Sequence, residues 1–191
     1  MLISCLRHAE TDRNVRGIFS SMGSESISES HRRALAAISF DVSDFDAIFC
    51  SPAQRCRETA EALGISGPII DHRIAERSFG VFEGLSAAQC QADHSADFEA
   101  FQRLDGEFVI PGGESRAAHL IRISAWIQDV ARHRHVLAVT HGGTIDFLYR
   151  IGSGHPTHGG STVFAGPNAA RSVFEVEWPE VSVIEHGVSL I

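Results

Sequence analysis

The hydrophobic and polar positions of the chain follow two alternating patterns. Four continuous apolar runs predict short buried strands, at 2–6, 47–50, 68–70 and 136–139. Three stretches between them repeat apolar residues every three or four positions and predict helices with one buried face, at 34–38, 53–63 and 120–130. The alternation of strands with helices indicates an α/β fold, with a mostly parallel sheet between two helical layers.

The end of the chain has a different pattern. Phe174, Val176 and Trp178 alternate with glutamates, which predicts a half-exposed strand. A second apolar alternation at 181–184 follows closely, so we expect an antiparallel hairpin that ends the sheet.

The whole chain, 1–191, is predicted to form a single three-layer α/β/α domain. No internal repeat or low-complexity linker divides it, and a chain of this length buries about 70% of the surface that its unfolded form exposes. Phe98 and Phe101 stand at helical spacing within a stretch of about 85–110, where we expect a helical insertion over the site. Pro111 breaks the chain before the next long helix, which we expect to begin near Ser115.

The net charge of −8 narrows the set of partners. Nucleic acids and anionic membranes bind clustered positive surfaces, so we expect neither as a partner. No stretch approaches 18 apolar residues, so we expect no membrane-spanning helix. Met1 leads directly into a short apolar run without a basic segment, so we do not expect secretion. The four cysteines form no CxxC pair, which is typical of a reducing compartment. We therefore expect a cytoplasmic protein, and the sequence leaves its oligomeric state open.

Basic residues follow the predicted strands. Arg7 and His8 end the first strand, Arg55 opens the helix after the second, and His141 follows the last central strand. In an open α/β sheet, ligands bind at the carboxyl ends of the strands. Guanidinium groups present paired donors to phosphoryl oxygens, and a helix that starts at Gly142 adds backbone N–H groups and a positive dipole end. The pattern predicts a phosphoryl-binding pocket.

Ser51 and Pro52 predict the start of the helix that carries Arg55. Serine is a favoured N-cap residue, and proline is favoured at the first helical position. Ser28 and Ser30 are candidates for the N-cap of the preceding helix.

Four motifs carry a family resemblance: Arg7–Thr11 with Asn14, Ser51–Arg55 with Thr59, Glu76–Gly80 with Glu83, and Thr140–Gly143. In this order they resemble the motifs of the histidine phosphatase superfamily, the phosphoglycerate-mutase-like proteins. The resemblance implies the phosphoglycerate-mutase-like fold. Because the chain is shorter than the mutases of this superfamily, the phosphatase branch is favoured.

The resemblance also implies a mechanism in which His8 attacks phosphorus and becomes a phosphohistidine that water hydrolyses. Arg7, Arg55 and His141 would hold the phosphoryl group, and Glu76 would be the general acid, with Glu83 as the second choice. Asn14 and Gly142 are candidate substrate contacts. The expected substrate is a small phosphate ester, and no metal or other cofactor is implied. The attacking imidazole must be neutral, and nearby guanidinium charges lower the pKa of a histidine.

Other interpretations of the same residues remain open. Arg7 and Arg55 are candidates for structural ion pairs, and His141 for a helix cap. His155 and His158 lie in a loop without neighbouring Cys or carboxylate ligands, so a metal site there is weakly supported.

Two departures from the family pattern concern the pocket. Ala9 replaces a glycine, and 18–27 lacks the usual segment. They motivate one alternative, a non-catalytic module that binds phosphorylated ligands. A phosphoglycerate-type mutase is the other alternative, although the chain is shorter than those mutases. The segments 12–27, 91–108 and 152–167 would select the ester, whose identity the sequence does not give.

Overall fold

The computed structural model describes residues 1–103, 106–157 and 164–191. His158 lies outside the described residues. Within these ranges, six strands form a single sheet in the order β3-β2-β4-β1-β5-β6. The strands are β1 (Leu2–Arg7), β2 (Ala47–Cys50), β3 (Ile69–Ile70), β4 (His135–Thr140), β5 (Ala170–Glu177) and β6 (Glu180–Ser189).

The first four strands of the chain are parallel, and the last two are antiparallel. β1 pairs with β4 from Leu2 and His135 to Arg7 and Thr140, so the two strands end at the same level. β2 pairs in parallel with β3 and β4. β5 and β6 form the predicted hairpin, and β5 joins it to β1 in antiparallel register. The predicted sheet and its antiparallel end are confirmed.

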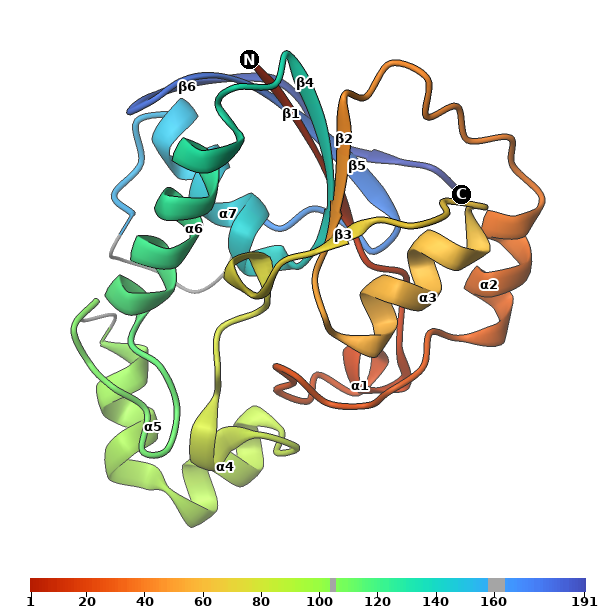
Figure 1. Ribbon diagram of the computed structural model, residues 1–191. Helices are drawn as coiled ribbons and strands as arrows, with labels where there is room; N and C mark the ends of the chain where they lie inside the picture. The colour runs from red at the N-terminus through yellow and green to blue at the C-terminus, as the bar shows by residue number, and fades with distance from the viewer. Residues whose placement is uncertain (104–105, 158–163) are drawn as a thin grey trace.

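Helices cover both faces of the sheet (Figure 1). On one face lie α6 (Arg116–Val130) and α7 (Gly142–Gly152), and on the other lie α2 (Glu29–Ala36) and α3 (Gln54–Ala62). Side chains of β1 alternate between the two cores, because successive residues of a strand point to opposite faces. Ile3 and Cys5 pack with α6 and α7, whereas Leu6 packs with α2 and α3. The predicted three-layer architecture is confirmed.

Two helix boundaries differ from the prediction. α3 begins at Gln54 after the N-cap Ala53, two residues later than expected. The Ser51 hydroxyl lies 2.7 Å from Nε2 of His141 and accepts from the Ala53 N–H at 3.3 Å, so it does not cap the first turn of α3. α2 begins after the N-cap Ser28, as predicted, but ends at Ala36, so Ile38 packs beyond the helix end. The long helix α6 begins just after 111–115, and Ser115 caps it by accepting a hydrogen bond from the Ala118 N–H.

The remaining helices are short, and α1, α4 and α5 lie in the lower part of Figure 1, toward the carboxyl ends of the parallel strands. They are α1 (Asp12–Val15), η1 (His72–Ile74), η2 (Gly80–Phe82), α4 (Ala87–Asp93) and α5 (Ser95–Gln102). Phe82 and Phe98 form a separate small core with Cys90 and Ile110. Phe19 packs its ring against this core, 5.7 Å from the ring of Phe101 between centroids, so the small core supports the loop that follows α1. No helix in the described parts of the chain is long and apolar enough to cross a membrane.

Candidate active site

Three of the predicted residues meet through direct hydrogen bonds at the carboxyl edge of the sheet. His8 follows β1, Arg55 lies in the first turn of α3, and His141 follows β4. The Nε of Arg55 donates to Nε2 of His8 at 3.1 Å, and its Nη2 donates to Nδ1 of His141 at 3.0 Å. The two imidazole rings lie edge to face, with centroids 5.3 Å apart. The pairing of β1 with β4 explains why His8 and His141 are close, because the two strands end side by side.

The His8 ring is held in one orientation. Its Nδ1 lies 2.8 Å from the Ala9 carbonyl, which can only accept, so Nδ1 carries the proton and the lone pair of Nε2 accepts from Arg55 Nε. The side chain is buried, and this burial, together with the charge of Arg55, holds the pKa of His8 well below its usual value. The imidazole therefore stays neutral with Nε2 facing the guanidinium of Arg55, as nucleophilic attack would require.

The His141 ring is fixed by the same reasoning. Nδ1 accepts from Arg55, so Nε2 carries the proton and donates to the Ser51 hydroxyl. Burial, followed by the Arg55 charge, lowers the pKa of His141 well below its usual value. Ser51, which we expected to be a helix cap, instead holds this ring. No feature of the sequence distinguishes the two roles of a serine at a strand end.

Glu76 is held beside the start of α7. Its Oε2 accepts from the Gly143 N–H at 3.2 Å, and its Oε1 accepts from the Arg77 N–H at 2.9 Å. A side chain at position 143 would collide with Glu76 Oε1 and lie 2.7 Å from Cε1 of His119. Only glycine fits at 143, and its hydrogen bond places the Glu76 carboxyl at the N-terminus of the helix that follows His141.

His119 is a site residue that sequence reasoning missed. It lies on the buried face of α6, and its Nε2 is buried without a hydrogen-bond partner in the described structure. Burial, and then the charges of Arg122, Arg77 and Arg116, lower the pKa of His119 well below its usual value. One feature of the sequence could have revealed His119: it lies at helical spacing from the apolar residues Ile123 and Ile127, on the buried face of the helix.

The other predicted residues have different neighbours. Arg7 donates through Nη1 to the Gly166 carbonyl, while its Nε is buried without a partner in the described structure. Asn14 completes the capping box of α1, because its Oδ1 accepts from the Thr11 N–H at 3.1 Å. Gly142 is the first residue of α7. Arg7 therefore keeps a buried donor, Nε, that could serve a ligand.

Glu83 does not join the two histidines. It pairs with Arg13 at 3.0 Å and accepts from the Ser21 N–H at 2.8 Å. This carboxylate therefore fixes the loop after α1, whereas the Glu76 carboxyl lies beside the start of α7.

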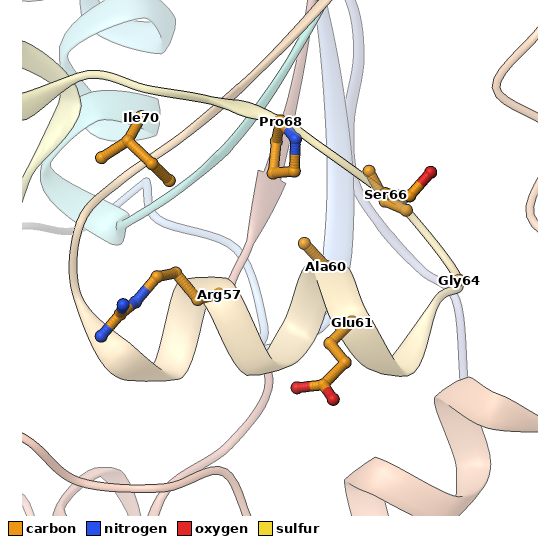
Figure 2. Close-up of a pocket in the computed structure, with 8 residues that line it drawn as sticks. Arg57, Ala60, Glu61, Gly64, Ser66, Pro68 and Ile70 are labelled. Atoms are coloured by element: carbon orange, nitrogen blue, oxygen red, sulfur yellow. The ribbon is translucent and has the colours of Figure 1, made fainter.

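A cavity of about 480 Å³ opens elsewhere, on the outer side of α3 (Figure 2). Arg57 and Glu61 extend from α3 there, beneath the segment that contains Pro68 and Ile70. None of the residues described above lines this cavity, so Arg57 belongs to the surface of α3 and not to the cluster around Arg55.

Comparison with known proteins identifies the family. The model of the histidine phosphatase superfamily (branch 1) matches residues 3–187. The chain belongs to this superfamily. It is 30% identical over 160 residues to probable phosphatase C1687.21 of Schizosaccharomyces pombe, covering 78% of this chain and 71% of the relative. It is 27% identical over 154 residues to phosphoserine phosphatase 1 of Hydrogenobacter thermophilus, covering 75% and 72%.

Solved structures of the superfamily have the same fold. The alpha-ribazole phosphatase from Shigella flexneri superposes with a TM-score of 0.82 at 22% identity, covering 100% of this chain and 99% of that one. The superfamily and the phosphatase relatives identify the chain as a phosphoric monoester hydrolase.

The departure of this histidine phosphatase at Ala9 is tolerated for a structural reason. Among the described non-glycine residues, only Ala169 has a positive φ, so Ala9 needs no glycine-like backbone. Its methyl group is buried in the core formed with α2 and α3, and its N–H donates to Thr59 at 2.9 Å. The alanine therefore leaves the backbone around His8 intact.

The buried histidines of the superfamily site predict an acid-sensitive fold. His8, His119 and His141 resist protonation when folded but titrate near pH 6.5 when unfolded. As pH falls, the unfolded state gains protons that the folded state does not, so stability falls. We expect the free energy of unfolding to drop by about 3 kcal/mol between pH 7 and 5.5, roughly 1 kcal/mol per histidine.

Urea unfolding at the two pH values measures this drop. The matched control is His119→Leu, which removes one titrating group and should lose about a third of the pH dependence. An unfolding free energy that stays constant from pH 7 to 5.5 would contradict the inference that these rings are buried and neutral.

Proposed function

We propose that this chain hydrolyses a small phosphate monoester without a metal ion, through a phosphohistidine on His8. The observation that carries the proposal is the hydrogen bond of 3.1 Å between Arg55 Nε and His8 Nε2. It puts a buried guanidinium directly beside the unprotonated nitrogen, where the phosphoryl group would arrive. The low pKa of His8 supports the same role, because a protonated ring has no lone pair for attack.

Binding of the phosphoryl group would rely on three positive sources. Arg55 and Arg7 supply guanidinium donors, which match phosphoryl oxygens in pairs. The start of α7 at Gly142 supplies backbone N–H groups and the positive end of a helix dipole. His141, fixed by Ser51, lies beside them and holds Arg55 through its Nδ1. Asn14 contributes indirectly in this proposal, by capping α1.

The reaction would proceed in two balanced steps. His8 Nε2 forms a bond to phosphorus while the P–O ester bond breaks, and protonated Glu76 gives its proton to the departing alkoxide. Water then attacks phosphorus, the P–N bond breaks, and Glu76 recovers a proton from the water. Inorganic phosphate leaves, and His8 is neutral again. Two backbone N–H groups fix the position of the Glu76 carboxyl beside the helix start, next to the residue that follows His141.

Several properties of the proposed enzyme follow from its surroundings. One curated relative is named a phosphoserine phosphatase, which supports a small phosphorylated metabolite as substrate. In the described residues, no group of three or more His, Cys, Asp or Glu side chains could hold a metal ion. The four cysteines are free and buried, which supports a location in the reducing cytoplasm.

A panel of sugar phosphates, phosphoglycerates, phosphoserine and nucleotides tests the proposal, with free phosphate measured in the presence of a chelator. We expect at least one ester to release phosphate, at a rate that the chelator leaves unchanged. The same assay tests the mutase alternative. A mutase would give isomerised product without free phosphate, so release of phosphate in step with loss of the ester would exclude it. Tight binding of an ester without any turnover would contradict the proposal and favour the non-catalytic alternative.

A further inference from the structure

In this structure, the carboxylate of Glu25 pairs with Arg55, the arginine proposed to bind the phosphoryl group. Glu25 Oε1 lies 2.9 Å from Nη1 of Arg55, and both side chains are buried, with 11% and 2% of their surface exposed. The Ser20 hydroxyl also donates to the same oxygen. The other carboxylate oxygen, Oε2, is buried without any hydrogen-bond partner in the described structure.

The guanidinium of Arg55 has no donor left over. Nε donates to His8, Nη2 donates to His141 and to the Ser21 carbonyl at 2.7 Å, and Nη1 donates to Glu25 and, at 3.5 Å, to the Ser20 hydroxyl. A phosphoryl oxygen can therefore bind Arg55 only if one of these partners withdraws. The two rings stay in place when a ligand binds, because each is fixed by its own hydrogen bond to Ala9 or Ser51, and His8 Nε2 would leave Arg55 only in the chemical step. Glu25 is the single anion that pairs with Arg55 in the described structure, and anions compete for the same donor.

The loop around Glu25 is anchored at both ends and exposed between them. Ser21 is held by Glu83 at 2.8 Å, and Ile27 is held by Glu58 at 3.0 Å. Between these anchors, Met22 is 48% exposed. A short exposed segment with fixed ends lets Glu25 leave Arg55 without unfolding its surroundings. The unpartnered Oε2 favours that departure, because a buried carboxylate oxygen without a donor gains hydrogen bonds on reaching water.

We propose that Glu25 is an internal competitor for Arg55 and thereby sets the affinity of the site for phosphoryl groups. The carboxylate holds Nη1 in the empty enzyme, and a phosphoryl group, with up to two negative charges, displaces it. This inference rests on the proposed function for the identity of the ligand. Glu25 thus determines which anions enter, since an incoming group must outcompete a buried ion pair.

The opposite role makes the opposite prediction. If Glu25 only orients Arg55 for substrate, its loss weakens phosphate binding, and glutamine, which keeps the hydrogen bond, restores the binding. If Glu25 competes, its loss strengthens phosphate binding, and glutamine strengthens it as well because the competing charge is gone.

Isothermal titration calorimetry with inorganic phosphate separates these roles, using wild type, Glu25→Gln and Glu25→Ala. We expect the Kd for phosphate to fall at least about tenfold in both variants, as removal of one charged hydrogen bond from a competing partner implies. Glu29→Gln is the matched control. It removes the same charge from the exposed start of α2, where Glu29 pairs with Arg33, and should leave the Kd unchanged.

A Kd that is unchanged or higher in both Glu25 variants would overturn the proposal, as would an equal fall in Glu29→Gln. Because binding is measured at equilibrium with phosphate alone, the result does not depend on turnover. Tighter binding in the Glu25 variants of a protein that hydrolyses no ester would support the competitor and contradict the proposed function. Hydrolysis of an ester by the wild type, together with weaker phosphate binding in the Glu25 variants, would support the proposed function and contradict the competitor.

Discussion

Replacing His8 by alanine should lower kcat at least about 10³-fold for every ester that the wild type hydrolyses. The reason is that attack needs a neutral imidazole with an unprotonated nitrogen, and in His8 this nitrogen is Nε2, which would exchange its hydrogen bond from Arg55 for the bond to phosphorus. Released phosphate gives the rate. To detect the intermediate, the reaction with an ester radiolabelled in its phosphoryl group is quenched, and acid-labile label on the protein is counted. The variant should carry no such label.

The control for His8→Ala is His8→Asn, whose amide can still donate to the Ala9 carbonyl. Both variants should be equally inactive and should still bind inorganic phosphate, because Arg7, Arg55 and the start of α7 remain. Activity within about tenfold of wild type in either variant, or label that persists on the protein, would rule out His8 as the phosphorylated residue.

The central part of the fold could be predicted from local patterns because its strands are covered on both faces. β4 is a continuous apolar run whose residues, from Val136 to Val139, are all buried, and β2 matches the predicted 47–50. Once these strands are parallel, their carboxyl ends are neighbours, so His8, Arg55 and His141 had to converge. The motif resemblance supplied the roles, and the sheet supplied the juxtaposition.

The loop after α1 could not be predicted in the same way. It has no period of two or of 3.6, and its partners lie far along the chain: Glu25 meets Arg55 thirty residues later, and Ser21 meets Glu83 sixty-two residues later. Such contacts depend on tertiary packing, here of Phe19 on the small aromatic core. Ser51 failed as a prediction for a related reason, because its hydroxyl had two possible partners and His141 comes from a distant strand.

The Glu76→Gln variant should lose about 10²- to 10⁴-fold in kcat on esters with an alkyl leaving group. Glutamine keeps the size of the side chain and can accept from the Gly143 or Arg77 N–H, but it has no proton to give to an alkoxide. On p-nitrophenyl phosphate, whose leaving group departs without a proton, the same variant should lose far less in the first chemical step. Single-turnover rates on the two substrates measure this difference.

Glu83→Gln is the matched control for Glu76→Gln, since it changes the other carboxyl of the same motif. Glu83 holds Arg13 and Ser21, so its loss should loosen the loop and act mainly through KM, with similar effects on both substrates. The dependence on the leaving group is the decisive readout, because a general structural defect slows both esters alike. If Glu83→Gln showed that dependence and Glu76→Gln did not, the acid would have been assigned to the wrong carboxyl, although Glu76 is the one beside the start of α7.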